Sequence, residues 1–189
     1  MKKMTKGLLL VLCAAVLVAG SVVGTLAWLT AKSETITNTF VIGNISITLS
    51  ETTGDTYKLV PGMPVAKDPT VTVKAGSEDC YLFVKVVNGI AAIEDSEKSI
   101  ASQMEEKGWK ALTGVENVYY YDGLVAAGAT DQVYPLFENY TVSSDVSDLS
   151  AYDGAKIVIT AYAVQSGAVG EMNVINLTNA WNTNFGANP

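Results

Sequence analysis

The 189-residue chain carries 12 basic and 19 acidic side chains, a net charge of −7, and contains neither His nor Arg. Nucleic acids and anionic lipids bind clustered cations, and Arg makes the bidentate contacts to phosphate, so we expect no nucleic-acid partner. The absence of His removes the commonest general base and most zinc sites. We therefore expect no enzyme activity, no catalytic residues, no cofactor and no metal site.

The N-terminus has the three parts of a secretory signal peptide. A short basic head precedes Gly7–Gly24, which is uncharged and rich in Leu, Val and Ala. Thr25 and Ala27 are small residues that suit the −3 and −1 positions, which predicts cleavage before Trp28 by a signal peptidase. The apolar stretch has about 18 residues, which is borderline for spanning a bilayer, so a retained membrane anchor is the other interpretation.

Cleavage changes the charge and the cysteine content of the chain. A signal peptide over residues 1–27 contains three of the 12 basic residues and no acidic one, which leaves 9 against 19 and a net charge of −10. It also contains Cys13, so Cys80 is the one cysteine of the mature chain and an intrachain disulfide is impossible. Cys80 begins an apolar stretch, which predicts a buried structural thiol rather than a nucleophile.

After the signal peptide, residues 28–38 are polar and rich in Thr once the apolar pair Trp28-Leu29 has passed. This composition predicts an extended N-terminal arm, and its β-branched residues favour strand. An extended arm can add to the exposed edge of a sheet, and an unstructured terminus is the other interpretation. The residues that we assign to assembly are Trp28, Leu29, Thr35, Ile36, Thr37, Thr39 and Phe40.

Residues 39–189 are expected to form one domain made mostly of strands. Apolar and polar residues alternate over short segments, which is typical of half-buried strands, and the segment that begins at Cys80 is almost continuously apolar, which predicts a central strand. Turns are predicted at Pro61-Gly62 and Gly76, and Asp122-Gly123 is a hairpin signal. The predicted strands are Phe40–Ser50, Tyr57–Val60, Thr70–Ala75, Cys80–Val87, Trp109–Leu112, Val115–Tyr121, at least one within Leu124–Val142, and Lys156–Gln165.

Two segments have helical spacing of apolar residues. Ile90–Lys107 predicts a helix that ends at Gly108. Val169–Phe185 predicts a weaker one, in which Met172, Ile175 and Trp181 share a face. Many short strands with frequent turns indicate a mainly β fold, a jelly-roll-like antiparallel β-sandwich with one or two short helices inserted.

Two further groups of residues are open to a functional interpretation. The loop 143–154 carries Asp145, Asp148 and Asp153, which are either solvated charges or oxygen ligands for Ca²⁺. Tyr119–Tyr121 and Trp109 are either an adhesive aromatic patch or strand residues that alternate between core and solvent.

Four motifs in order along the chain resemble those of one family. Gly24–Ala31 looks like the signal-peptide exit that the SipW-type signal peptidase reads, and Asn38–Ile47 is similar to the first strand, "NTFxxGxLDL". Leu59–Met63 resembles "LxPGD", and Ala161–Gln165 followed by Trp181 resembles "AxAVQ…W". Together they resemble the TasA/camelysin family of secreted biofilm-matrix proteins.

The resemblance implies a jelly-roll sandwich in the extracellular matrix or on the cell surface. It also implies fibres, in which the N-terminal arm of one subunit completes the sheet of the next by donor-strand exchange. The implied partners are copies of the chain itself, other matrix proteins or cell-wall components. The alternative function is a surface adhesin or glycan-binding module on the same fold. Camelysins have been labelled metallopeptidases, an activity that a chain without His is not expected to share.

The first prediction concerns processing. Secretion should release a chain that begins at Trp28, because Thr25 and Ala27 suit the peptidase. N-terminal sequencing of the secreted protein measures this. A cell-associated form that retains residues 1–24 would contradict the prediction and favour the membrane anchor.

Overall fold

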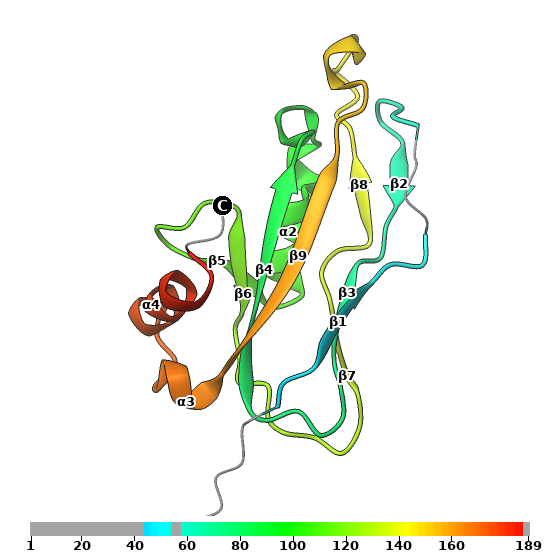
Figure 1. Ribbon diagram of the computed structural model, residues 1–189. Helices are drawn as coiled ribbons and strands as arrows, with labels where there is room; N and C mark the ends of the chain where they lie inside the picture. Colours follow the sequence, from blue (N-terminus) through cyan, green and yellow to red (C-terminus); the bar gives the residue numbers. More distant parts are fainter. Residues whose placement is uncertain (1–43, 54–57, 187–189) are drawn as a thin grey trace, which may run out of the picture. The chain divides into compact units, whose positions relative to one another are not determined.

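Strands dominate the described part of the chain, and every pairing between them is antiparallel (Figure 1). The computed structural model describes residues 44–53 and 58–186, all of which belong to one compact unit that spans residues 42–189. The prediction of a mainly β fold with few helices is confirmed. The strands are β1 (Ile47–Ser50), β2 (Pro64–Ala66), β3 (Thr70–Val73), β4 (Cys80–Asn88), β5 (Trp109–Ala111), β6 (Val118–Tyr121), β7 (Gln132–Pro135), β8 (Asn139–Thr141) and β9 (Ile157–Gln165).

The strands are arranged in three sheets, of orders β5-β6-β4-β9, β1-β3-β7 and β2-β8. The longest ladder joins β4 and β9, from Cys80 opposite Gln165 to Asn88 opposite Ile157. Short helices and 3₁₀ turns lie between the later strands and after β9. They are η1 (Ala91–Ile93), η2 (Ser96–Lys98), α2 (Ile100–Glu106), η3 (Ser150–Tyr152), α3 (Ser166–Val169) and α4 (Val174–Asn184).

Strand β4 is central, as predicted, and is buried on both faces. Successive side chains of a strand point to opposite sides. Leu82 and Val84 enter a first core together with residues of β3 and β8, whereas Tyr81 and Phe83 enter a second core beneath α4. A strand covered on both faces needs an almost continuous apolar sequence, which explains why this segment does not alternate.

Helix α4 covers the second core through Leu177, Ala180 and Trp181. The Trp181 ring centroid lies 5.7 Å from that of Phe83. The sequence predicted that Ile175 and Trp181 share the apolar face of a helix. This is correct for Trp181 and wrong for Ile175, which is 72% exposed. The helix begins after the N-cap Asn173, and this start places Ile175 on the side away from the sheet.

The helix predicted over Ile90–Lys107 is wrong for its first half. The chain forms η1 and η2 there, and α2 begins only after Ser99. The Ser99 hydroxyl accepts a hydrogen bond from Ser102 N–H, and the Asp95 carboxylate accepts one from Glu97 N–H. Each cap starts a new helical turn instead of extending the previous one. Gly108 ends α2 at φ 86°, as predicted.

The strand predicted over Tyr57–Val60 is also wrong in its described part, because residues 58–60 pair with no strand. The predicted Pro61-Gly62 turn is confirmed: Met63 N–H donates to the Val60 carbonyl at 3.1 Å, and Gly62 has φ 73°. This turn moves the strand pairing beyond it, to β2 and β8.

Asp122-Gly123 forms no hairpin. After β6 the chain stays beside β4, where Val125 pairs with Cys80. The two residues form an irregular step in that pairing, at which Asp122 N–H donates to the Gly108 carbonyl at 2.8 Å. The hairpin that does form joins β5 to β6.

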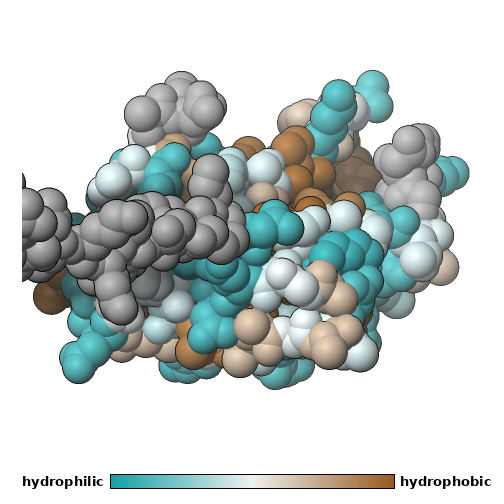
Figure 2. Space-filling model, turned by 60° about the horizontal axis from the view of Figure 1, so that its bottom comes forward, coloured by the Kyte–Doolittle hydropathy of each residue, from teal (hydrophilic) through white to brown (hydrophobic). Residues whose placement is uncertain are grey.

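The surface of the described part is mixed. On the face shown in Figure 2, hydrophilic and intermediate side chains cover most of the surface, and apolar groups gather in one area of its upper half. None of the described helices has the length and apolar content needed to cross a membrane. The large apolar side chains with notable exposure are Leu49, Met63, Val87, Leu124, Val133, Val158, Val174 and Ile175.

The second prediction concerns the first core. Leu82→Ala should lower the free energy of unfolding by about 2–5 kcal/mol, because Leu82 is 0% exposed and its removal leaves a cavity. Urea unfolding measures this. Val133→Ala is the matched control, since Val133 is 65% exposed and should cost at most about 0.5 kcal/mol. Equal losses for both variants would contradict the core assignment.

Candidate functional site

Strand β9 has an open edge, which is the first feature of the candidate site. One side of β9 pairs with β4 along the whole strand, and no described strand pairs with its other side. Strand β1 lies near β9 without forming a ladder with it. An unpaired strand edge is a template for another extended chain.

The backbone hydrogen bonds next to β9 show which of its residues face the open edge. The Lys156 carbonyl accepts from Gly89 N–H at 2.9 Å, so Lys156 is directed toward β4. Ser166 N–H donates to the Asp79 carbonyl at 2.8 Å, and Ser166 is directed the same way. Because the direction alternates along a strand, the odd-numbered residues present their N–H and C=O groups to the open edge. They are Ile157, Ile159, Ala161, Ala163 and Gln165.

The core-facing side chains of β9 are more exposed than those of β4. Val84 and Val86 face the first core and are 0% and 4% exposed. Their cross-strand partners Ala161 and Ile159 face the same core and are only half-buried. This contrast is expected where no strand of the described residues pairs with the far side of β9.

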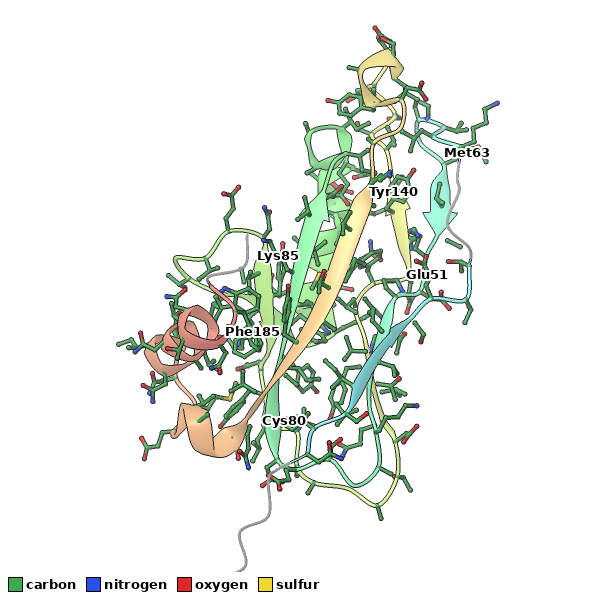
Figure 3. The ribbon with its side chains drawn as sticks, viewed as in Figure 1. Glu51, Met63, Cys80, Lys85, Tyr140 and Phe185 are labelled. Carbon is green, nitrogen blue, oxygen red and sulfur yellow. The ribbon has the colours of Figure 1, made fainter. Side chains whose placement is uncertain are left out.

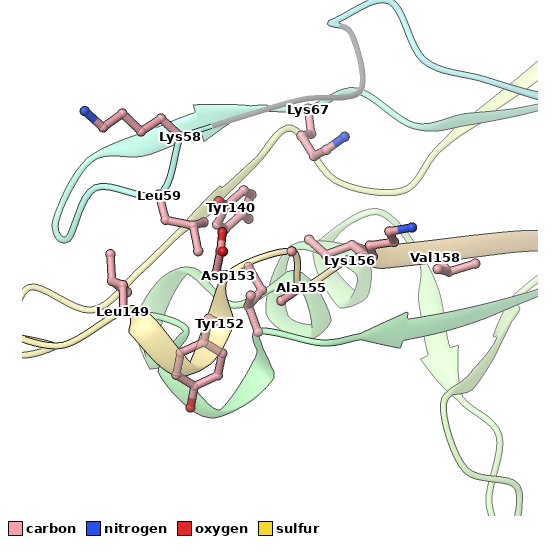
Figure 4. Close-up of a pocket in the computed structure, with 13 residues that line it drawn as sticks. Lys58, Leu59, Lys67, Tyr140, Leu149, Tyr152, Asp153, Ala155, Lys156 and Val158 are labelled. Carbon is pink, nitrogen blue, oxygen red and sulfur yellow. The ribbon is translucent and has the colours of Figure 1, made fainter.

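A partly open cavity of about 690 Å³ lies at the N-terminal end of β9 (Figure 4). Its apolar lining comes from four segments that are far apart in the sequence, through Leu59, Ile90, Tyr140, Leu149 and Ile157. Among the described residues, Lys58, Lys67, Lys156 and Asp153 contribute charges to the lining.

Tyr140 is the most deeply placed polar residue of this lining. It is 3% exposed, and its hydroxyl has no hydrogen-bond partner within residues 44–53 and 58–186. Burial raises the pKa of Tyr140, so the hydroxyl stays protonated at neutral pH and is available as a donor. Figure 3 shows Tyr140 on β8, at the opposite end of the fold from Cys80.

Ile90 is held at the cavity by a small polar network at the end of β4. The Asn88 side-chain oxygen accepts from Ile90 N–H at 3.0 Å. The Glu94 carboxylate accepts from the Asn88 amide at 3.2 Å and from Ile100 N–H at 2.9 Å. Burial raises the pKa of Glu94, and these two hydrogen bonds oppose that shift. The network fixes the backbone between β4 and α2.

The predicted processing and assembly residues lie outside the described residues. These are Thr25, Ala27, Trp28, Leu29, Thr35, Ile36, Thr37, Thr39 and Phe40. Sequence reasoning missed the cavity, because no local pattern connects residues 149–158, which contribute most of the lining, with Leu59, Ile90 and Tyr140. The alternation of β9 predicted its strand but gave no sign that one edge is open.

The prediction of an exposed aromatic patch for adhesion is wrong. Trp109 is 1% exposed, and its indole N–H donates to the Pro135 carbonyl at 3.0 Å. Tyr119 and Tyr121 pack against the first core and Tyr120 belongs to the second. The alternative prediction, that Tyr119–Tyr121 alternate between core and solvent, is also wrong. The second core beneath α4 covers the face of β6 that was expected to be exposed to solvent.

The acidic loop does not bring its carboxylates together as a ligand set. Asp148 instead accepts a hydrogen bond from Ser150 N–H at 2.8 Å, at the first residue of η3. This hydrogen bond lowers the pKa of Asp148. Across the part of the chain that the structure describes, no group of three His, Cys, Asp or Glu residues is placed to hold a metal ion.

Cys80 is buried, as predicted, with 0% exposure at the start of β4. Burial, with a smaller contribution from the nearby Asp79 carboxylate, raises the pKa of Cys80 to about 11. A neutral, inaccessible thiol is a poor nucleophile.

Comparisons with known proteins give no relative: no family model, no curated protein and no solved structure matches the chain.

The third prediction concerns Cys80. In the native mature chain an aromatic disulfide reagent at pH 8 should label this thiol at least tenfold more slowly than in the urea-unfolded chain, because the thiol is buried and protonated. The native pKa is raised, so stability should fall as pH rises from about 9 toward about 11. Cys80→Ala should lose that part of the pH dependence. Rapid labelling of the folded protein would contradict the prediction.

Proposed function

We propose that the chain is a secreted structural protein of the extracellular matrix or cell surface, whose copies assemble into fibres by donor-strand exchange. In this proposal the fold is a jelly-roll-like sandwich, and the N-terminal arm of one copy pairs with the open edge of β9 in the next. The motif resemblance to the TasA/camelysin family supports it, as does the signal-like N-terminus.

The observation that carries the proposal is the open edge of β9. Its outward-directed backbone groups can form a ladder with an incoming strand. Its half-buried core-facing side chains, among them Ile159 and Ala161, would gain cover from the same strand. An added strand would therefore form backbone hydrogen bonds with the odd-numbered residues of β9 and bury the apolar side chains of those same residues.

The arm has the composition and length that this edge requires. Residues 28–40 outnumber the nine residues of β9 and contain Ile36, Phe40 and four Thr that favour strand. A link from the arm of one copy to the edge of another does not close on itself, so repetition produces a filament. Before cleavage the signal peptide would hold the arm at the membrane, which delays assembly until export.

The fourth prediction tests the donor. A mature chain that lacks residues 28–36 should remain folded by circular dichroism and should form no filaments in electron microscopy, because no donor strand is present. When the shortened chain is mixed with the full mature chain, it should cap growing filaments, because it can accept an arm and has none to donate. If the shortened chain polymerises as well as the full mature chain, the proposed donor role is wrong.

Two variants of β9 test whether its open edge accepts the arm. Ala161→Lys places a charge on the core-facing side of the open edge and should block pairing, as inward-pointing charges on natural edge strands do. Val158→Lys is the matched control, because Val158 is on the other face of the same strand and is 51% exposed. Both variants should fold, and only Val158→Lys should form filaments. Filaments of both variants would place the acceptor elsewhere.

A further inference from the structure

The chain leaves β4 through Asn88-Gly89, and the close approach of β9 requires the glycine. A Cβ atom on Gly89 would lie 2.9 Å from the Lys156 carbonyl oxygen and 3.2 Å from the Lys156 backbone nitrogen. Both are main-chain atoms, so a side chain at this position would push the neighbouring ends of β4 and β9 apart. The fold therefore keeps a glycine directly after Asn88.

This pair of residues can react with itself. With no side chain on Gly89 to hinder the approach, the Gly89 backbone nitrogen can attack the side-chain carbonyl carbon of Asn88. A C–N bond forms between them, and the side-chain nitrogen of Asn88 leaves as ammonia with the proton that Gly89 gives up. Water then opens the cyclic imide at either of its carbonyl groups, which produces aspartate or isoaspartate. Water is the co-reactant, and nothing is oxidised or reduced.

The folded chain holds both reacting groups in hydrogen bonds. Gly89 N–H donates to the Lys156 carbonyl at 2.9 Å, so its nitrogen is engaged away from Asn88. The Asn88 side-chain oxygen accepts from Ile90 N–H at 3.0 Å, and the side-chain nitrogen donates to the Glu94 carboxylate at 3.2 Å. The backbone of Asn88 is extended as the last residue of β4. The attack requires these contacts to break first.

We propose that Asn88 is a deamidation site, which the folded chain protects and which reacts when the end of β4 opens. Folded proteins open locally at a smaller free-energy cost than they unfold globally, so the opening of this segment sets the rate. The product would replace the amide that donates to Glu94 by a second carboxylate. Burial already raises the pKa of Glu94, so two charges there would oppose closure.

Deamidation would therefore loosen the end of β4 permanently. It would also release Ile90, which lines the cavity. The inference does not depend on fibre formation, since every residue that it uses belongs to one copy.

The test compares deamidation of the mature chain when it is folded and when it is unfolded in urea at pH 8. Peptide mapping by mass spectrometry measures the reaction, because the change from amide to carboxylate raises the mass of the peptide that contains Asn88. Asn88 should convert about tenfold or more slowly in the folded chain, since only open molecules react. Equal rates in the two states would overturn the proposal.

Two variants separate the local hydrogen bonds from folding in general. Glu94→Gln replaces one carboxylate oxygen by a donor, so one of the hydrogen bonds that Glu94 accepts from Asn88 and Ile100 is lost. Folded Glu94→Gln should deamidate severalfold faster than the folded wild-type chain, and equally fast when both are unfolded. Glu97→Gln is the matched control, because Glu97 is exposed on η2. If circular dichroism shows that both variants fold and Glu94→Gln reacts no faster, the protective role of this network is wrong.

Asn88→Asp imitates the product of the reaction. It should unfold at a lower urea concentration than the wild-type chain, because the new carboxylate faces Glu94. Asn44→Asp is the matched control, since Asn44 is exposed and its urea midpoint should not change. An unchanged midpoint for Asn88→Asp would overturn the proposed loosening of β4.

Discussion

The fold depends on the burial of β4 on both of its faces. Leu82 and Val84 pack into the first core, and Tyr81 and Phe83 pack into the second, so one strand connects two separate hydrophobic cores. Each core needs a cover of its own. Strands of the other two sheets cover the first, and α4 covers the second.

The same arrangement places β9 at the end of its sheet among the described strands. As the neighbour of β4 it contributes side chains to both cores, with Ile159 and Ala161 on one face and Tyr162 and Val164 on the other. No described strand continues the sheet beyond it. The last strand of a sheet keeps its pairing capacity and part of its apolar surface. In the proposal of fibre assembly, this edge is the feature that accepts the arm of the next copy.

The open edge of β9 and the cavity adjoin each other, because Ile157 belongs to both. The open edge offers backbone hydrogen bonds along the strand. The cavity offers lysine charges and the Tyr140 hydroxyl at the start of that strand, near Ile157.

The sequence alone determined those strands that can be recognised from the apolar pattern within a single segment. The continuous apolar segment at β4 follows from burial on two faces, and the alternation in the first half of β9 follows from burial on one. Gly62 and Gly108 mark turns because of their backbone freedom. The charge, the absence of His and the burial of Cys80 were also apparent from the sequence. Tertiary structure decided the rest. Side-chain caps at Asp95 and Ser99 interrupted a helical pattern, and α4 turned an expected wet face of β6 into a second core. The open edge and the cavity could not be predicted, because both depend on which segments do or do not become neighbours. That information lies in the packing between distant residues such as Leu59, Tyr140 and Ile157, and not in the pattern of any one segment.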